Sequence, residues 1–370
     1  MTLAEEIHER ALQLNVPLSV HLDITYRCNE RCVHCYLDHD DHGEMSTAEI
    51  KDLLTQLADA GVFFLTLSGG EILMRRDFFD ILAFARLLTF NVKLKTNGVM
   101  IRQPEAKRIR ELGVQGIQIS VYSHRPEVHD AITKLPGSLQ RTIDAIGFLK
   151  SQGLKVTIAN VLMSSNSGDY AGVVTLANEL GVAYTLDPTI TPKMDGDRSI
   201  LHLGIGSAEL GQVFHDSDLV GSVEDFCAPP PPPGEDIMEG YPCSAGHTSC
   251  YISPYGDVYP CVQFPLPSGN VRRQKFIEIW RDSGELKQVR SIRAKDLTTC
   301  SSCAHVGTCS RCPGLAYMEG SMVGPSTADC QKSFQRTGIP TANMLRRGSV
   351  APVGPLLQIL PMASVSAEGC

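Results

Sequence analysis

The sequence predicts an α/β protein, a partial (β/α)6 barrel followed by a small cysteine-rich C-terminal domain. Between residues 18 and 188, strand-like and helix-like segments alternate in about six units of roughly 30 residues. Such alternation requires parallel strands joined by right-handed crossovers, and six units are too few to close an eight-stranded barrel. The chain also contains 13 cysteines and no secretion signal, so clustered cysteines indicate metal ligands rather than disulfides.

The expected elements follow from hydrophobic periodicity and from helix-capping residues. Ser46-Thr47-Ala48-Glu49 is a capping box that begins a helix, and Gly61 stops that helix just after Ala60. Pro104 is expected in the first turn of a later helix. The strands are expected at Leu18–Ile24, Val62–Leu67, Val92–Thr96, Gln115–Val121, Lys155–Met163 and Val182–Leu186. The other helices are expected at Asp77–Leu88, Pro104–Leu112, Ser138–Ser151 and Asp169–Leu180.

The pattern changes after residue 188, which gives five expected regions. These are an N-terminal helix (1–17), the barrel (18–188), a linker (189–240), a cysteine-rich domain (241–334) and a loosely ordered tail (335–370). The linker contains the five-proline run Pro229–Pro233, which is typical of a stiff extended spacer. The cysteine-rich domain has few long helical patterns, so we expect metal rather than a hydrophobic core to hold it together.

Composition excludes several classes of partner. With 33 basic and 41 acidic residues the formal charge is −8, which gives no electrostatic reason to bind nucleic acid or an anionic membrane. No run of 18 apolar residues occurs, and the N-terminal MTLAEEIHER lacks the apolar stretch of a signal peptide. We therefore expect a cytoplasmic protein with no nucleic-acid or membrane partner.

Three cysteines directly follow the first long strand. Cys28, Cys32 and Cys35 have the spacing C-x3-C-x2-C, and three thiolates on one short loop can hold three corners of an iron–sulfur cube. No fourth cysteine lies nearby, so one iron would remain open, as a reactive centre requires. The alternative is a zinc site completed by His34 or His39, although zinc prefers paired C-x2-C knuckles.

This segment resembles the signature loop of the radical S-adenosylmethionine (SAM) superfamily, C-x3-C-x-Φ-C. His34 stands at the Φ position and Tyr36 follows the last cysteine. The resemblance implies that Cys28, Cys32 and Cys35 carry a catalytic [4Fe–4S] cluster whose open iron chelates SAM. It further implies that reductive cleavage of SAM gives a 5′-deoxyadenosyl radical, which abstracts hydrogen from a substrate.

The resemblance also assigns residues to SAM. Ser68-Gly69-Gly70-Glu71 resembles the GGE motif that holds the SAM amino group, with Ile72 where the family often has proline. Asn97 belongs to a Thr-Asn-Gly loop that is similar to one near the ribose, or is simply a helix-entry turn. Ser120 and Arg141 would bind the ribose or the methionine carboxylate, unless Arg141 is a surface residue. Ile158–Val161 would line the adenine, or belong to the core. The SAM-binding set implied by the resemblance is His34, Tyr36, Ser68, Gly69, Gly70, Glu71, Asn97, Ser120 and Arg141.

A second cysteine field resembles the SPASM domain, which carries two auxiliary iron–sulfur clusters. Its pattern here is Cys243-x12-Gly256-x4-Cys261, then Cys300-x2-Cys303-x5-Cys309-x2-Cys312, then Cys330. The family spaces the last pair of the quartet by three residues, and here only Ser310 and Arg311 intervene. The resemblance implies one cluster on Cys300, Cys303, Cys309 and Cys330. It implies a second on Cys243, Cys261 and Cys312, with Cys250, Cys227 or no residue as the fourth ligand. A zinc ribbon built from the two C-x2-C pairs is the alternative.

Together these motifs predict a radical SAM enzyme that modifies a ribosomally made peptide, for example by crosslinking it. Val262 stands where sulfatase activators have an aspartate, and Cys309 where the pyrroloquinoline-quinone enzyme has one, so we do not expect either activity. A radical SAM enzyme of cofactor or heme biosynthesis acting on a small molecule, and a non-enzymatic metal-binding scaffold, remain as alternatives. Fewer than about twenty residues precede the first strand, so a separate leader-peptide-binding protein is expected, together with an electron donor such as flavodoxin or ferredoxin.

Overall fold

The computed structural model describes residues 3–346 and divides the chain into two compact units. The first contains Met1–Gly204 and Ser244–Arg290, and the second contains Ile205–Cys243 and Ser291–Cys370. Residues 244–290 thus group with the barrel, whereas the sequence pattern placed them in the cysteine-rich domain. The reason is that this segment supplies strands to the sheet of the first unit.

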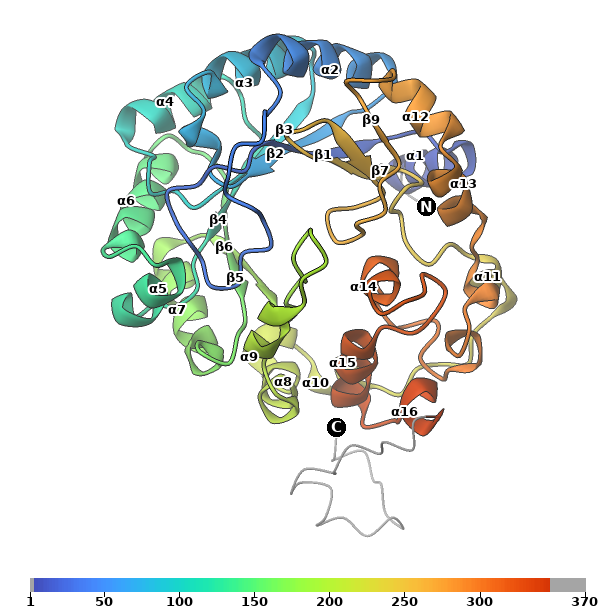
Figure 1. Cartoon of the computed structure of the whole chain (residues 1–370). Helices are drawn as coiled ribbons and strands as arrows, with labels where there is room; N and C mark the ends of the chain where they lie inside the picture. Colours follow the sequence, from blue (N-terminus) through green and yellow to red (C-terminus); the bar gives the residue numbers. More distant parts are fainter. Residues whose placement is uncertain (1–2, 347–370) are drawn as a thin grey trace. The chain divides into compact units, whose positions relative to one another are not determined.

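The first unit is built on one sheet with the strand order β6-β5-β4-β3-β2-β1-β7-β8-β9. Strands β1 to β7 are parallel to their neighbours, and β8 and β9 are antiparallel additions at the β7 edge. The expected α/β partial barrel is confirmed, and Figure 1 shows helices around the outside of its strands. The strands are β1 Ser19–Thr25, β2 Phe64–Gly69, β3 Asn91–Thr96, β4 Gly116–Ser120, β5 Val156–Val161, β6 Ala183–Asp187, β7 Ser249–Ile252, β8 Asp257–Tyr259 and β9 Gly269–Asn270.

Helices of the first unit begin and end close to the expected positions. Ser46 caps α2, its side chain accepts the Glu49 N–H, and the capping box is complete. Gly61 follows with φ +92°, and Pro104 lies in the first turn of α4. Helix α5 was not expected from the sequence. The helices are α1 Leu3–Leu14, α2 Thr47–Asp59, η1 Ile72–Met74, α3 Phe78–Leu87, α4 Gln103–Glu111, α5 Pro126–Thr133, α6 Ser138–Ser151, η2 Ser167–Asp169, α7 Tyr170–Leu180, η3 Ser199–Leu203, α12 Phe276–Asp282 and α13 Gly284–Ser291.

Each strand divides its side chains between a helix-facing core and the barrel interior. On β1, Val20, Leu22 and Ile24 are fully buried in the same apolar cluster as residues of α2. On β3, Val92 and Leu94 belong to this cluster, whereas the alternate residue Lys95 is exposed. The period of two along a strand therefore leaves polar side chains inside the barrel.

The second unit contains short helices, some of them in the region expected to be a linker. Helices α8 and α15 pack against each other, and the proline run Pro229–Pro233 lies between α10 and α11. The helices are α8 Ser207–Phe214, α9 Ser217–Val220, α10 Val223–Cys227, α11 Glu235–Glu239, η4 Ala294–Asp296, η5 Cys300–Ser302, α14 Pro313–Met318, α15 Thr327–Thr337 and α16 Ala342–Arg346. The expected loose tail is therefore helical at its start, and residues 347–370 lie outside the described range. Within that range, no helix has both the length and the apolar character needed to cross a membrane.

Arg75 joins the strand before the first cysteine loop to the starts of two helices after it. Its Nη1 donates to the carbonyls of Ile24 and Met45, both at 2.9 Å, and its Nε and Nη2 donate to the two carboxylate oxygens of Asp77 at 3.0 and 2.6 Å. The Arg75 side chain is buried, and its bonds hold the pKa of Asp77 at about 2. Asp77 also accepts from Thr47 in the first turn of α2. One guanidinium thus fixes the end of β1 against two helix starts.

We predict that Arg75→Lys lowers the free energy of unfolding by about 2–4 kcal/mol, because a lysine cannot replace the paired bonds to Asp77 and both carbonyl bonds. Arg76→Lys is the matched control, since Arg76 is exposed, and it should change stability by less than about 0.5 kcal/mol. Urea denaturation of both variants measures the difference. Equal midpoints for the two variants would contradict this role of Arg75.

Candidate active site

The three N-terminal cysteines open into one cavity at the carboxyl ends of the barrel strands. Cys28, Cys32 and Cys35 all line a cavity of about 560 Å³ in the first unit. None of the three forms a disulfide. Burial raises the pKa of Cys28 to about 12 and also raises the pKa values of Cys32 and Cys35. The nearby carboxylate of Glu30 makes a smaller contribution in the same direction. Three grouped thiols become thiolates when a cationic metal centre compensates their charge.

The structure places the histidine of the cysteine loop beside the three cysteines. His34 lines the cavity with a buried, unpartnered Nδ1, and burial lowers its pKa to about 4.

The two glycines after β2 allow their backbone to pack directly on the cysteine loop. A Cβ on Gly69 would lie 2.1 Å from the Thr25 carbonyl oxygen, and one on Gly70 would lie 2.4 Å from that of Arg27. The Gly70 N–H donates to Thr25 and the Glu71 N–H to Arg27, at 2.8 and 2.9 Å. Ser68, Gly69 and Gly70 line the cavity, so these glycines serve the approach of one loop to another as well as the cavity wall.

Glu71 is held by donors from the loops after β2 and β3. Its carboxylate is fully buried and is not part of the cavity wall. It accepts from the Thr96 hydroxyl at 2.8 and 2.9 Å, from the Asn97 N–H at 2.9 Å and from the Leu73 N–H at 3.1 Å. Its contact with the SAM amino group stays a prediction.

Asn97 connects the third strand to the cysteine loop. It lines the cavity, and its Nδ2 lies 2.9 Å from Asn29 Oδ1 and 3.7 Å from Cys28 Sγ. Its Oδ1 accepts the Val99 N–H. The Thr-Asn-Gly segment therefore places the Asn97 side chain beside Cys28. A turn that only led into a helix would not need this contact.

The other expected SAM contacts divide into two groups. His34, Tyr36 and Ser120 line the cavity, as do residues 159–161 of the segment expected at the adenine, whereas Ile158 is buried in the core. Arg141 does not line it, because its guanidinium donates to the carbonyls of Gly137 and Pro136 at 3.0 and 2.7 Å. The surface alternative considered for Arg141 therefore agrees with its position.

Sequence reasoning missed the polar interior of the barrel. Lys95, Gln118, Thr185 and Asp187 line the same cavity from β3, β4 and β6. Lys95 is open to the interior but surrounded by protein, and this burial lowers the pKa of its amine. The alternation of Leu94, Lys95 and Thr96 was the available signal, since a lysine between buried residues must face the interior.

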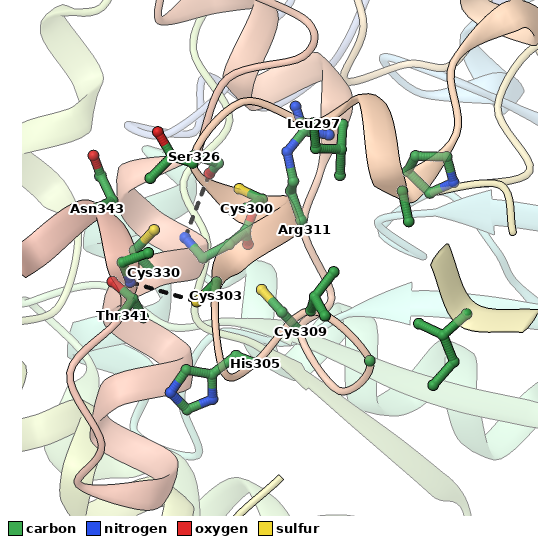
Figure 2. Close-up of a pocket in the computed structure, with 18 of the residues that line it drawn as sticks. Leu297, Cys300, Cys303, His305, Cys309, Arg311, Ser326, Cys330, Thr341 and Asn343 are labelled. Carbon is green, nitrogen blue, oxygen red and sulfur yellow. Dashed lines mark hydrogen bonds between the residues drawn. The ribbon is translucent and has the colours of Figure 1, made fainter. Parts of the chain in front are cut away.

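A second cavity, of about 310 Å³, lies within the second unit. It is lined by Cys300, Cys303, Cys309 and Cys330, the four cysteines that the resemblance assigns to one cluster, and Figure 2 shows them around one space. Burial raises the pKa of Cys300 to about 11. Cys312 is not part of this wall; its sulfur accepts the Leu315 N–H at the start of α14.

The remaining cysteines are divided between the units. Cys250, on β7, is buried in the apolar core of the first unit, and Cys227, on α10, is buried in the second, where its thiol lies 3.8 Å from the Phe214 carbonyl. Cys261 belongs to the first unit, and Cys243 and Cys312 belong to the second. The ligand set of this other auxiliary cluster stays a prediction.

Comparison with known proteins agrees with these two cysteine sites. Residues 22–172 match the family model of the radical SAM superfamily, and residues 243–313 match the SPASM iron–sulfur cluster-binding domain. The chain is 30% identical over 329 residues to an AdoMet-dependent heme synthase of Oleidesulfovibrio alaskensis, covering 81% of this chain and 83% of that one. It is 27% identical over 347 residues to the mycofactocin maturase MftC of Mycobacterium tuberculosis, covering 90% and 88%.

Among solved structures, the chain resembles Streptococcus suis SuiB bound to its precursor peptide SuiA, with a TM-score of 0.70 at 18% identity over 89% of this chain and 80% of that one. At this identity the likeness concerns the fold alone. The family matches, the relatives and the two cysteine cavities lead to one conclusion. The chain belongs to the radical SAM superfamily and is an enzyme that uses S-adenosyl-L-methionine and iron–sulfur clusters, with a SPASM domain in its C-terminal part.

Proposed function

We propose that the protein matures a ribosomally made peptide by forming a crosslink. The 5′-deoxyadenosyl radical would take one hydrogen atom from a peptide residue; as the new bond forms, the second hydrogen would leave as a proton and its electron would pass to an auxiliary cluster. Bound [4Fe–4S] cluster and SAM together supply a 5′-deoxyadenosyl radical for this chemistry. The role of the chain is to hold the cluster on Cys28, Cys32 and Cys35, to orient SAM against Ser68–Gly70 and Asn97, and to place the peptide beside it.

The observation that carries the proposal is the polar wall of the first cavity. Away from the cysteines, its lining includes the amides of Gln118 and Gln263, the hydroxyl of Thr185 and the charged groups of Lys95 and Asp187. Such a mixture of donors and acceptors suits the amide groups of a peptide, which need a partner for each N–H and C=O when they leave water. Two relatives support it by their names, the mycofactocin maturase MftC and the bacteriocin subtilosin biosynthesis protein AlbA of Bacillus subtilis.

A second candidate is the oxidation of a tetrapyrrole, as in the heme synthases. The observation in its favour is the 30% identity to one of these enzymes. Tyr36, Tyr122 and Leu186 on the same wall also offer aromatic and apolar surface to a flat macrocycle.

Two further partners belong to the proposal. An external one-electron donor such as flavodoxin or ferredoxin would reduce the cluster, and a small leader-peptide-binding protein would deliver the substrate. Purification of the tagged enzyme from the native host tests for the leader-peptide-binding protein. If no small protein co-purifies in a stoichiometric amount, this part of the proposal is contradicted.

Turnover separates the two candidates. Anaerobically reconstituted protein is given SAM, a reductant and each short peptide that the native host's genome encodes near this gene. One of them should become lighter by two hydrogen atoms, measured by mass spectrometry. The same assay with an iron tetrapyrrole should leave the tetrapyrrole unchanged. An unmodified peptide together with a decarboxylated tetrapyrrole would reverse the order of the two candidates.

Cysteine variants test the N-terminal cluster. Cys32→Ala should lose about four iron atoms per chain and all 5′-deoxyadenosine formation, because the triplet has no spare thiolate in its cavity. Cys370→Ala is the control, because the motif resemblance assigns this cysteine to no cluster, and the iron content of this variant should be unchanged. Iron analysis with chromatography of 5′-deoxyadenosine measures both, and an active Cys32→Ala enzyme would disprove the ligand assignment.

We predict that Glu71→Gln raises the KM for SAM several-fold while the iron content is kept. The new amide NH2 group would face donors that now bond to the carboxylate. At least one of these donors would lose its acceptor, at a cost of about 1–3 kcal/mol. As a result, Asn97 would shift from its position beside Cys28. Glu111→Gln, on the exposed end of α4, is the control. A KM equal to that of the unaltered enzyme would show that Glu71 does not position this wall.

A further inference from the structure

Arg311 is a buried cation in the shortened turn of the second cysteine field. Its side chain is 8% exposed. Its Nε donates to the Gly324 carbonyl at 2.8 Å, and its Nη2 donates to the carbonyls of Met322 and Gly324 at 2.6 and 2.5 Å. All three bonds end on neutral groups, so they fix the guanidinium without compensating its charge.

No carboxylate in the described part of the chain forms an ion pair with Arg311, and its Nη1 has no hydrogen-bond partner there. Asp329, the acidic residue in the wall of the same cavity, is already used. One of its oxygens pairs with Lys332 Nζ at 2.6 Å, and the other accepts the Cys312 N–H at 2.8 Å. A buried charge without a counter-charge is strongly unfavourable, so the site requires an anion that the polypeptide does not supply.

The cavity beside Arg311 is suited to such an anion. Arg311 is among the residues that line it, together with Cys300, Cys303, Cys309 and Cys330, and Figure 2 shows all five around the same region. An iron–sulfur cluster bound by four thiolates carries a net negative charge, and nearby charge and hydrogen bonding set its reduction potential. A cluster in this cavity would therefore supply the missing counter-charge.

We propose that Arg311 sets the reduction potential of the auxiliary cluster held by Cys300, Cys303, Cys309 and Cys330. The proposal rests on the ligand set proposed for this cavity. Reduction transfers one electron from an external donor to the cluster and makes it more negative by one unit. The fixed guanidinium stabilises this reduced form more than the oxidised form, and so raises the potential. Arg311 is not a catalytic residue. Its role is to hold a positive charge in a fixed place near the cluster.

The experiment uses the full-length chain with Cys28, Cys32, Cys35 and Cys261 replaced by alanine, so that only this cluster contributes to the signal. In that parent, Arg311→Met, Arg311→Lys and Arg346→Met are compared by dithionite titration followed by electron paramagnetic resonance. Arg346→Met removes the same charge from an exposed position on α16. Arg311→Met should lower the equilibrium constant for reduction about tenfold, or about 59 mV for one electron. Arg311→Lys and Arg346→Met should stay near the parent.

Four results would overturn the proposal. An Arg311→Met protein with full iron and the parental potential would show that the charge has no influence. An equal shift in Arg346→Met would show only a general effect of net charge. Iron loss in both Arg311→Met and Arg311→Lys, with the parental potential in the cluster that remains, would assign Arg311 a purely structural role. A parent without a four-iron Mössbauer signal would instead show that the ligand set itself fails, and the role of Arg311 with it.

Discussion

The close approach of two backbone segments, Gly69–Gly70 against Thr25–Arg27, is the constraint on which the first cysteine site depends. At both glycines any side chain would meet a carbonyl oxygen within van der Waals distance, so the loop after β2 can rest directly on the loop that carries the cysteines. Glu71 extends the contact to the loop after β3, where its carboxylate holds Asn97. Asn97 returns to Asn29 beside Cys28. Three consecutive strand ends are thus joined into one rigid wall, as preorganised chemistry requires.

The two cavities differ in their number of cysteines and in the charged side chains around them. The first contains three cysteines and several polar groups that face a space large enough for more than a cluster. The second contains four cysteines, is smaller, and has a buried guanidinium beside it. Three protein ligands leave a coordination position for a reactant, whereas four fill the cluster and leave electron transfer as its chemistry. With the ligand sets proposed for the two cavities, cysteine would thus serve two different tasks in one chain.

Sequence reasoning found what local patterns encode. Alternating strands and helices gave the barrel, the Ser46–Glu49 capping box gave the start of α2, and cysteine spacing gave the groups of residues that share each cavity. It could not reach the partners that side chains find in the fold. The motif gave no sign that Glu71 bonds to Thr96, because that contact joins the ends of two different strands. Nor did the cysteine pattern of residues 244–290 reveal that their strand β7 pairs with β1.

That pairing has a consequence for biosynthesis. Ser19–Leu22 lie alongside Ser249–Ile252, so the first strand to leave the ribosome keeps one edge unpaired until more than two hundred further residues have been made. Unpaired edges attract other strands, and contacts of long sequence separation form slowly. The oxygen-sensitive cysteine loop directly follows this edge. Nascent chains are therefore most vulnerable to misassociation, and to iron insertion into an unfinished scaffold, during the long interval before the C-terminal half arrives.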